Sequence, residues 1–146
     1  MLMLETRSIS WWYWLATVIL LTAGMCGRPV GFLLAIGLTV LHLIHFCMRE
    51  RSLVAFPIQV RLGYFLLLLI ALPENFRWIC WVPIIGTWAQ VLFGYCAMAR
   101  MVSLLPWNRK HALSFALFKQ TFVSTPVRGN ILQGLPPLNK ESYRHA

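Results

Sequence analysis

Residues 81–108 read WVPIIGTWAQVLFGYCAMARMVSLLPWN, and the fold that the sequence predicts depends on this stretch. It is an apolar run long enough to cross a bilayer, and basic residues follow Pro106 at its end. Four small or amide residues recur within it at spacings of four, four and three: Gly86, Gln90, Gly94 and Ala97. These spacings predict one shared helix face. Small residues let helix backbones approach closely in lipid, so we expect a helix-packing face in a membrane protein.

The composition supports the same interpretation. Of the 146 residues, 59% are hydrophobic and 12% are charged, and the mean hydropathy is +0.67. Soluble domains carry about 25% charged residues, so this chain has too few to cover a surface that faces water. We expect one domain embedded in the bilayer, with little chain left for a soluble catalytic unit.

The predicted fold class is an all-α membrane protein with four transmembrane helices in a domain of residues 1–108. The spans cover about 11–26, 30–48, 59–72 and 78–105. Trp11 opens an aromatic cluster typical of the headgroup layer, and Gly27-Arg28-Pro29 predicts a turn. The third span is short for a hydrocarbon core of about 30 Å, and we expect Arg61 to extend it by reaching toward the headgroups.

Residues 109–146 are basic and less apolar than the rest of the chain. They predict a cytoplasmic interfacial helix, capped by Asn108 and ending near Val123, and then an extended tail. The residues expected to contact a partner or lipid headgroups are Arg109, Lys110, Lys119 and Arg128.

The formal charge of +9 is distributed unevenly about the predicted spans. With four spans, one side of the membrane carries only Arg28 and Arg77, and the other side carries all remaining Lys and Arg residues. The positive-inside rule then places both termini in the cytoplasm. No basic region interleaved with aromatic residues forms a soluble module, so nucleic-acid binding is not expected.

Residues 60–109 carry a partial family signature. Within them, Gly94, Tyr95, Cys96, Met98 and Ala99 match a pattern like G-[FY]-C-P-[LM]-[YA]-x-L-L, although Ala97 replaces the proline and Leu104-Leu105 is displaced. This region resembles the small two-helix domain of bacterial inner membranes that is sometimes fused to rhodanese sulfurtransferases. The resemblance implies a helical hairpin in the bacterial inner membrane and adds no enzymatic role, because no rhodanese active-site loop is present. Together with the four predicted spans, it makes a multi-pass protein of that membrane the expected localisation.

His42 and His45 lie in the second predicted span and are the candidate metal ligands. Neutral imidazole ligates haem iron, and His111 is placed to approach the same leaflet. One alternative function is therefore a haem- or quinone-binding electron-transfer subunit, in which Gln90 contacts a quinone carbonyl. Bis-histidine haem needs histidines on facing helices, so we favour structural histidines and no cofactor.

Cys96 is the candidate reactive thiol. Arg100 follows one helical turn later, and a nearby cation lowers a thiol pKa. A second alternative function is thus an oligomeric carrier of small solutes or sulfur species. The simpler interpretation is that Cys96 packs among its apolar neighbours.

The favoured function is a non-catalytic accessory or anchoring subunit of a larger bacterial inner-membrane complex. The only acids, Glu5, Glu50, Glu74 and Glu141, lie outside the predicted spans, so neither a proton relay nor a paired-carboxylate site can be assembled within them. The expected partners are other membrane protein subunits and anionic lipid headgroups, and we do not expect an enzyme.

Overall fold

The computed structural model describes residues 8–109 and 111–125, and every regular element within these ranges is a helix. The elements are α1 Ile9–Met25, α2 Val30–Glu50, α3 Phe56–Ala71, the 3-10 helix η1 Glu74–Cys80, α4 Trp81–Phe93, α5 Ala97–Ser103 and α6 Phe115–Val123. The predicted all-α fold is confirmed. The predicted extended tail after residue 125, together with Lys110 and Arg128, lies outside the described residues.

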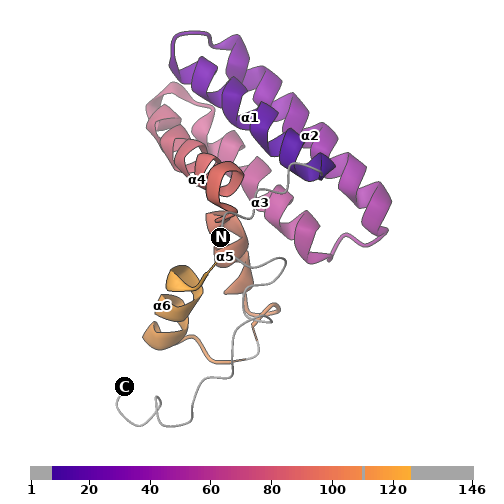
Figure 1. Ribbon diagram of the computed structural model, residues 1–146. Helices are drawn as coiled ribbons and strands as arrows, with labels where there is room; N and C mark the ends of the chain where they lie inside the picture. The colour runs from indigo at the N-terminus through magenta and orange to yellow at the C-terminus, as the bar shows by residue number, and fades with distance from the viewer. Residues whose placement is uncertain (1–7, 110, 126–146) are drawn as a thin grey trace.

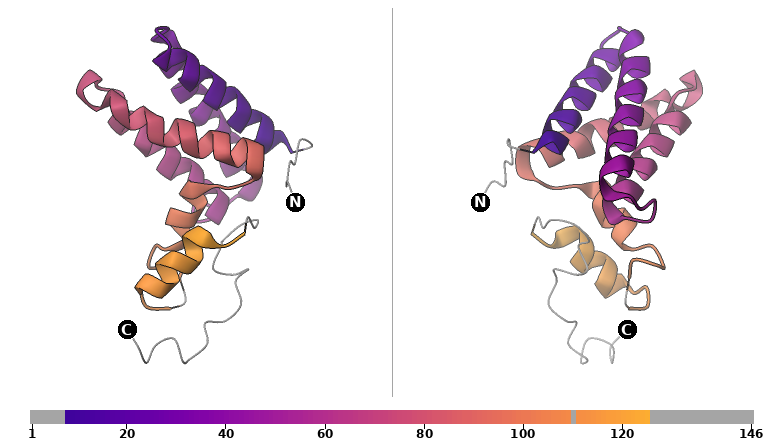
Figure 2. Two further views of the ribbon diagram at one scale, coloured as in Figure 1. Left: turned by 60° about the vertical axis from the view of Figure 1, so that its left-hand side comes forward. Right: turned by 90° about the vertical axis from the view of Figure 1, so that its right-hand side faces the viewer.

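The four longest α-helices form a bundle in which consecutive helices run antiparallel (Figure 1). α1 packs against α2 and α4, and α3 packs against α2 and η1. α5 packs against α3, and α6 contacts α5 further from the bundle (Figure 2). The two short helices therefore lie toward one end of the bundle, the end at which α1 begins and α2 and α4 end.

Local signals in the sequence set the helix ends. The Ser8 hydroxyl caps α1 by accepting a hydrogen bond from the backbone N–H of Trp11 at 3.2 Å. The turn after α1 contains Gly27 with φ of 96°, a left-handed conformation that glycine adopts without steric cost. The C-cap that follows α2 is Arg51, a non-glycine residue with φ of 51°. The predicted turn at Gly27-Arg28-Pro29 is where the structure places it.

Two helices of the bundle approach each other closely beside that turn. Gly24 of α1 and Gly31 of α2 are both buried, and a Cβ built on Gly31 would lie 2.5 Å from the Leu20 carbonyl oxygen and 2.8 Å from the Gly24 nitrogen. No side chain fits at that distance. The absence of a Cβ at Gly31 is thus what allows α1 and α2 to meet this closely.

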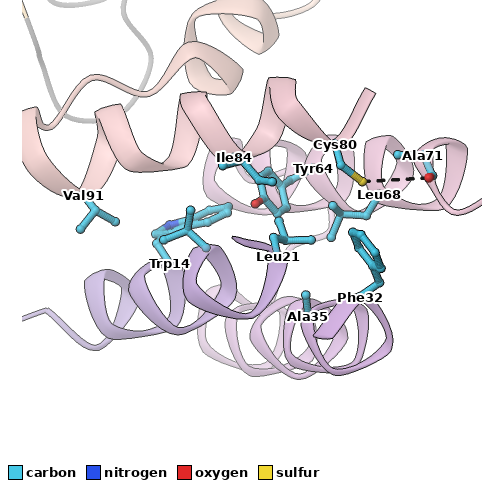
Figure 3. Packing of buried hydrophobic residues seen from close by; sticks show 11 residues of the cluster. Trp14, Leu21, Phe32, Ala35, Tyr64, Leu68, Ala71, Cys80, Ile84 and Val91 are labelled. Atoms are coloured by element: carbon cyan, nitrogen blue, oxygen red, sulfur yellow. Dashed lines mark hydrogen bonds between the residues drawn. The ribbon is translucent and has the colours of Figure 1, made fainter. Parts of the chain in front are cut away.

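Large apolar side chains from all four helices of the bundle fill its interior (Figure 3). The labelled members are Trp14 and Leu21 of α1, Phe32 and Ala35 of α2, Tyr64, Leu68 and Ala71 of α3, Cys80 of η1, and Ile84 and Val91 of α4. A second, smaller cluster joins α3 to α5 through Val60, Ala99 and Val102. The bundle therefore has a contiguous core, and α5 is an extension of it.

Two helical segments are long and apolar enough to cross a membrane, namely Val30–Glu50 and Glu74–Phe93, in which η1 runs directly into α4. α1 and α3 are apolar but have only 17 and 16 residues. At 1.5 Å per residue they span about 25 Å, against about 30 Å of hydrocarbon. Helix length thus supports two of the four predicted spans and leaves the other two unconfirmed.

The predicted fourth span is interrupted. Gly94 adopts φ of 72° and donates its N–H to the Gln90 carbonyl at 2.9 Å, which is the geometry of a glycine helix stop. α4 therefore ends at Phe93, and a new helix begins at Ala97.

The helix expected after the fourth span begins later than predicted. The Ser114 hydroxyl, rather than the Asn108 amide, caps α6, and it accepts from the Leu117 N–H at 3.2 Å. Nδ2 of Asn108 instead donates to Oε1 of Gln59 at 2.6 Å and to the Val102 carbonyl at 2.9 Å. Asn108 thus fixes the chain after α5 against the start of α3.

Candidate functional site

The residues of the predicted packing face lie on both sides of the helix break. Gly86 and Gln90 are on α4, Gly94 terminates it, and Ala97 is the first residue of α5. The chain doubles back after Gly94, so that a Cβ built on Gly86 would lie 3.9 Å from the Cβ of Ala97. The single helix face that the spacing predicted therefore does not form, and Gly86 and Ala97 instead let α5 approach α4 within the chain.

A buried polar cluster joins α1, α2 and α3. Arg61 is 6% exposed and His42 is 1% exposed. Nε of Arg61 donates to Nε2 of His42 at 2.9 Å, and its terminal nitrogens donate to the Pro57 carbonyl at 2.6 Å and to Oγ of Ser10 at 2.9 Å. One guanidinium thus connects a residue of α1 and a residue of α2 to α3.

Aromatic rings enclose this cluster. The His42 ring stacks on Tyr13 at a centroid distance of 4.4 Å, and Trp14 meets it edge-on at 5.1 Å. The Arg61 guanidinium carbon lies 3.5 Å from the centroid of Phe46, close enough for a cation–π interaction. Neutral acceptors and π faces therefore surround a positive charge that would be costly to bury without them.

The expected role of Arg61 is wrong. We predicted that its guanidinium reaches outward to the headgroups, but it points into the bundle and is bonded there. The reason is its position on α3, because Arg61, Tyr64, Leu68 and Ala71 share the buried face of this helix.

The histidines have structural contacts. Nε2 of His42 accepts from Arg61, so the lone pair that a metal at this nitrogen would need is already in use. His45 is half-buried near Tyr13, and His111 is exposed ahead of α6. Within residues 8–109 and 111–125, no group of three or more His, Cys, Asp or Glu side chains is placed to hold a metal ion.

Arg100 connects α5 to the end of α6. Its side chain is 0% exposed, and NH1 donates to the Thr121 carbonyl and to Oγ of Ser124, while NH2 donates to the Ser124 and Thr125 carbonyls. These carbonyls lie at a helix C-terminus, where backbone acceptors lack intrahelical partners and the helix dipole is negative. A buried cation is therefore well placed to terminate α6.

Tyr95 strengthens the same junction. Its hydroxyl donates to the Phe122 carbonyl at 2.8 Å, and its ring lies 4.0 Å from the Arg100 guanidinium carbon. Leu117 and Thr121 are the buried residues of α6 and face this junction. The side chains of Arg100 and Tyr95 therefore hold α6 in a fixed orientation on α5.

The environment of Cys96 does not favour a reactive thiolate. Cys96 is the N-cap of α5, and its Sγ accepts from the Ala99 N–H at 3.3 Å. Burial raises the pKa of this thiol, and its effect exceeds the lowering by Arg61 and Arg100. Arg100 does lower the pKa of this thiol, as its spacing predicted, but burial has the larger effect and the net direction is upward.

The remaining predicted contact residues lie near the α5–α6 end. Arg109 is half-buried and Lys119 is exposed on α6. Lys119 is surrounded by outward apolar side chains, among them Phe115 at 83% exposure, and Phe118 and Val123. Gln90 is half-buried, and its amide makes no hydrogen bond within the described part of the chain.

Sequence reasoning missed the inward-facing arginines and the close contact at Gly31. The helical period contained a signal for Arg61, which lies three, seven and ten residues before buried apolar positions of α3. Arg100 likewise lies three residues before a buried position of α5, although that position is the polar Ser103. The pairing of Arg100 with α6 depends on the break at Gly94 and could not be read from spacing.

No family model, curated protein or solved structure matches the chain in comparisons with known proteins. The interpretation of the site therefore depends on its geometry and chemistry.

Proposed function

We propose that the chain is a non-catalytic accessory or anchoring subunit of a larger bacterial inner-membrane complex. In this proposal the helices α1, α2, α3 and η1–α4 cross the membrane, and both termini lie in the cytoplasm. The resemblance of residues 60–109 to an inner-membrane hairpin domain supports the bacterial setting.

The observation that carries the membrane placement is the outward surface of the bundle. Large apolar side chains are exposed on every long helix, and they include Ile19, Leu33, Leu34, Leu41, Ile44, Leu62, Leu66, Ile70, Val82 and Ile85. Polar side chains of the same helices, including His42, Arg61 and Thr87, point inward. A water-soluble bundle has the opposite pattern, whereas lipid solvates an apolar exterior.

Short helices are compatible with this placement. A span of 16 or 17 residues fits when the bilayer thins locally or when flanking residues reach the interface, at a cost of fractions of a kcal/mol per Å of mismatch. Exposed tryptophans are available at both ends, with Trp12 at the start of α1 and Trp78 and Trp81 at the opposite end.

The distribution of charge supports the orientation. Arg49, Arg51, Arg109 and Lys119 lie toward the end of the bundle where α1 begins, with α5 and α6, whereas Arg28 and Arg77 lie at the other end. The positive-inside rule assigns the first of these ends to the cytoplasm.

The proposed partner surface is the outward face of α6. Arg100 and Tyr95 bind the C-terminal end of this helix on the side that faces α5. Phe115, Phe118 and Val123 therefore remain exposed around Lys119 on the opposite side. An apolar helix face that is held rigidly and carries a central cation is suited to binding a cytoplasmic partner. Because α6 is joined to the bundle through α5, a partner bound to α6 would be anchored to the membrane.

The test is affinity purification in mild detergent at native expression, followed by mass spectrometry of stoichiometric companions. The wild-type chain is expected to carry larger membrane subunits, and Phe115→Glu is expected to lose them while the bundle stays folded. Leu33→Ala, which alters a lipid-facing residue, is the matched control and should retain them. Recovery of the wild-type chain alone, with every membrane complex intact in a deletion strain, would overturn the proposal.

A further inference from the structure

The connector between α2 and α3 is an ordered turn with an apolar tip. The Ala55 N–H donates to the Ser52 carbonyl at 3.3 Å, which places Leu53 and Val54 at the two central positions of the turn. Such positions usually carry Gly, Pro, Asn, Asp or Ser. Here both side chains are aliphatic, and they are 77% and 73% exposed. The described part of the chain therefore leaves this apolar tip uncovered.

A second turn is held beside the first and exposes a tryptophan. A backbone hydrogen bond of 2.9 Å closes residues 105–108, and Trp107 within this turn is 68% exposed. Gln59, near the start of α3, joins the two turns. Its Nε2 donates to the Val54 carbonyl at 2.7 Å, and its Oε1 accepts from Nε1 of Trp107 at 3.0 Å. We call the apolar surface made by Leu53, Val54 and Trp107 the double-turn surface.

The double-turn surface continues the apolar exterior of α2. Ile44 and Met48 are exposed near the end of this helix, and the chain reaches Leu53 directly afterwards (Figure 1). α2 has 21 residues and is about 31 Å long, which matches the hydrocarbon core of about 30 Å. In the proposed membrane placement, the turn after α2 therefore lies where headgroups meet acyl chains. Tryptophan with a bonded N–H and an exposed ring is typical of this layer.

Cations flank the double-turn surface. Arg49 and Arg51 are exposed just before it, and Arg109 follows it, whereas Glu50 is the one acid of the described chain at this end of the bundle. This excess of positive charge is complementary to anionic lipid headgroups. Apolar side chains bordered by cations are suited to the boundary between headgroups and acyl chains.

We propose that the double-turn surface inserts into the cytoplasmic leaflet of the membrane, with Leu53, Val54 and the Trp107 ring below the headgroups of anionic lipids. Insertion also compensates for the length of α3, which has only 16 residues, because the apolar turn directly precedes this helix and extends its lipid-facing segment. The insertion rests on the proposed membrane placement of the bundle. It uses a surface separate from the α6 face that we assign to a partner.

Spin labels test the insertion in vesicles of phosphatidylcholine and phosphatidylglycerol. In a background lacking the native cysteines, the full-length chain carries one label after Leu53→Cys, Leu66→Cys or Leu113→Cys. Leu66 faces outward on α3, and Leu113 is exposed ahead of α6. The accessibility of each label to oxygen, which concentrates in lipid, is divided by its accessibility to an aqueous nickel complex. We expect this ratio at position 53 to exceed the ratio at position 113 by about three-fold or more.

The label at position 66 separates failure of the insertion from failure of the membrane placement. A lipid signature at position 66 with an aqueous signature at position 53 would overturn the insertion alone. An aqueous signature at position 66 would overturn both proposals. Protection of position 53 from both reagents would show that protein covers the turn, and it would also overturn insertion into lipid.

The role of anionic headgroups has its own comparison. In vesicles of phosphatidylcholine alone, the ratio of oxygen to nickel accessibility at position 53 should fall, because the flanking cations no longer meet anionic lipid. An equal ratio in both kinds of vesicle would overturn the preference for anionic lipid.

A further measurement retains the native cysteines, in case their removal prevents folding. The tryptophan emission that is lost in Trp107→Phe should be quenched by brominated lipid more strongly than by acrylamide in the aqueous phase. Stronger quenching by acrylamide would place the Trp107 ring in water and overturn the insertion.

Discussion

Nε of Arg61 donates a hydrogen bond to Nε2 of His42 across 2.9 Å, and both side chains are buried between α2 and α3. The donation fixes the imidazole as the acceptor and therefore keeps His42 neutral at this nitrogen. A histidine that sequence analysis singled out as a possible metal ligand is thus part of a structural bond between two helices.

His42→Phe keeps the ring volume and removes the acceptor. A buried donor on a charged group is then left unsatisfied, so the free energy of unfolding should fall by about 2–3 kcal/mol. Thermal unfolding in detergent, followed by tryptophan fluorescence, measures the loss. His45→Phe is the control and should change stability by less than about 0.5 kcal/mol, because His45 makes no hydrogen bond in the described structure. Equal effects of the two substitutions would contradict this role of His42.

Arg100→Leu should release α6 without unfolding the bundle. The carbonyls of Thr121, Ser124 and Thr125 would lose their donor, and the bond from Tyr95 to the Phe122 carbonyl would be the remaining hydrogen bond of the junction. Hydrogen exchange followed by mass spectrometry should show faster exchange over residues 114–125 and unchanged exchange in α1 and α2. Arg109→Leu is the matched control, and protection of α6 equal to wild type in Arg100→Leu would refute the junction.

Gly31→Ala should destabilise the α1–α2 contact, since the added Cβ would lie 2.5 Å from a backbone oxygen. The expected loss is about 1–3 kcal/mol from overpacking. Gly37 lies on the same helix and a Cβ there meets nothing within 4 Å, so Gly37→Ala should be neutral or stabilising by up to about 1 kcal/mol. Thermal unfolding of the two variants measures both changes in stability. A Gly31→Ala protein as stable as wild type would contradict the close approach of α1 and α2.

Alkylation kinetics test the state of Cys96. Its raised pKa leaves less thiolate at neutral pH, so Cys96 should react with iodoacetamide more slowly than the exposed Cys26. Quenched labelling followed by peptide mass spectrometry gives both rates in one sample. Faster modification of Cys96 than of Cys26 would restore the reactive-thiol interpretation.

The sequence predicted the features that depend on local chemistry. Apolar runs located the first three long helices to within about three residues and the start of the fourth, and Gly27-Arg28-Pro29 marked a turn that the structure contains. Glycine and proline act on the backbone directly, so their effect is visible without knowledge of neighbours.

The features that depend on tertiary contacts were predicted poorly. Gly94 was read as a small packing residue because its spacing to Gly86 and Gln90 fitted a helix, whereas its left-handed conformation ends that helix. Arg61 was read as a headgroup contact because arginine in an apolar segment usually avoids burial. The acceptors that make its burial possible come from Ser10 and His42, distant in sequence, and no local pattern reveals them.

The most direct test of the proposed membrane placement is cysteine accessibility in intact cells. In a background lacking the four native cysteines, single cysteines are introduced at Arg28, Ser52, Asn75 and Leu113, and are labelled with a membrane-impermeant maleimide before and after permeabilisation. Four spans with cytoplasmic termini predict that positions 28 and 75 label from outside and that positions 52 and 113 label only after permeabilisation. Labelling of all four positions from the same side would contradict the proposed topology.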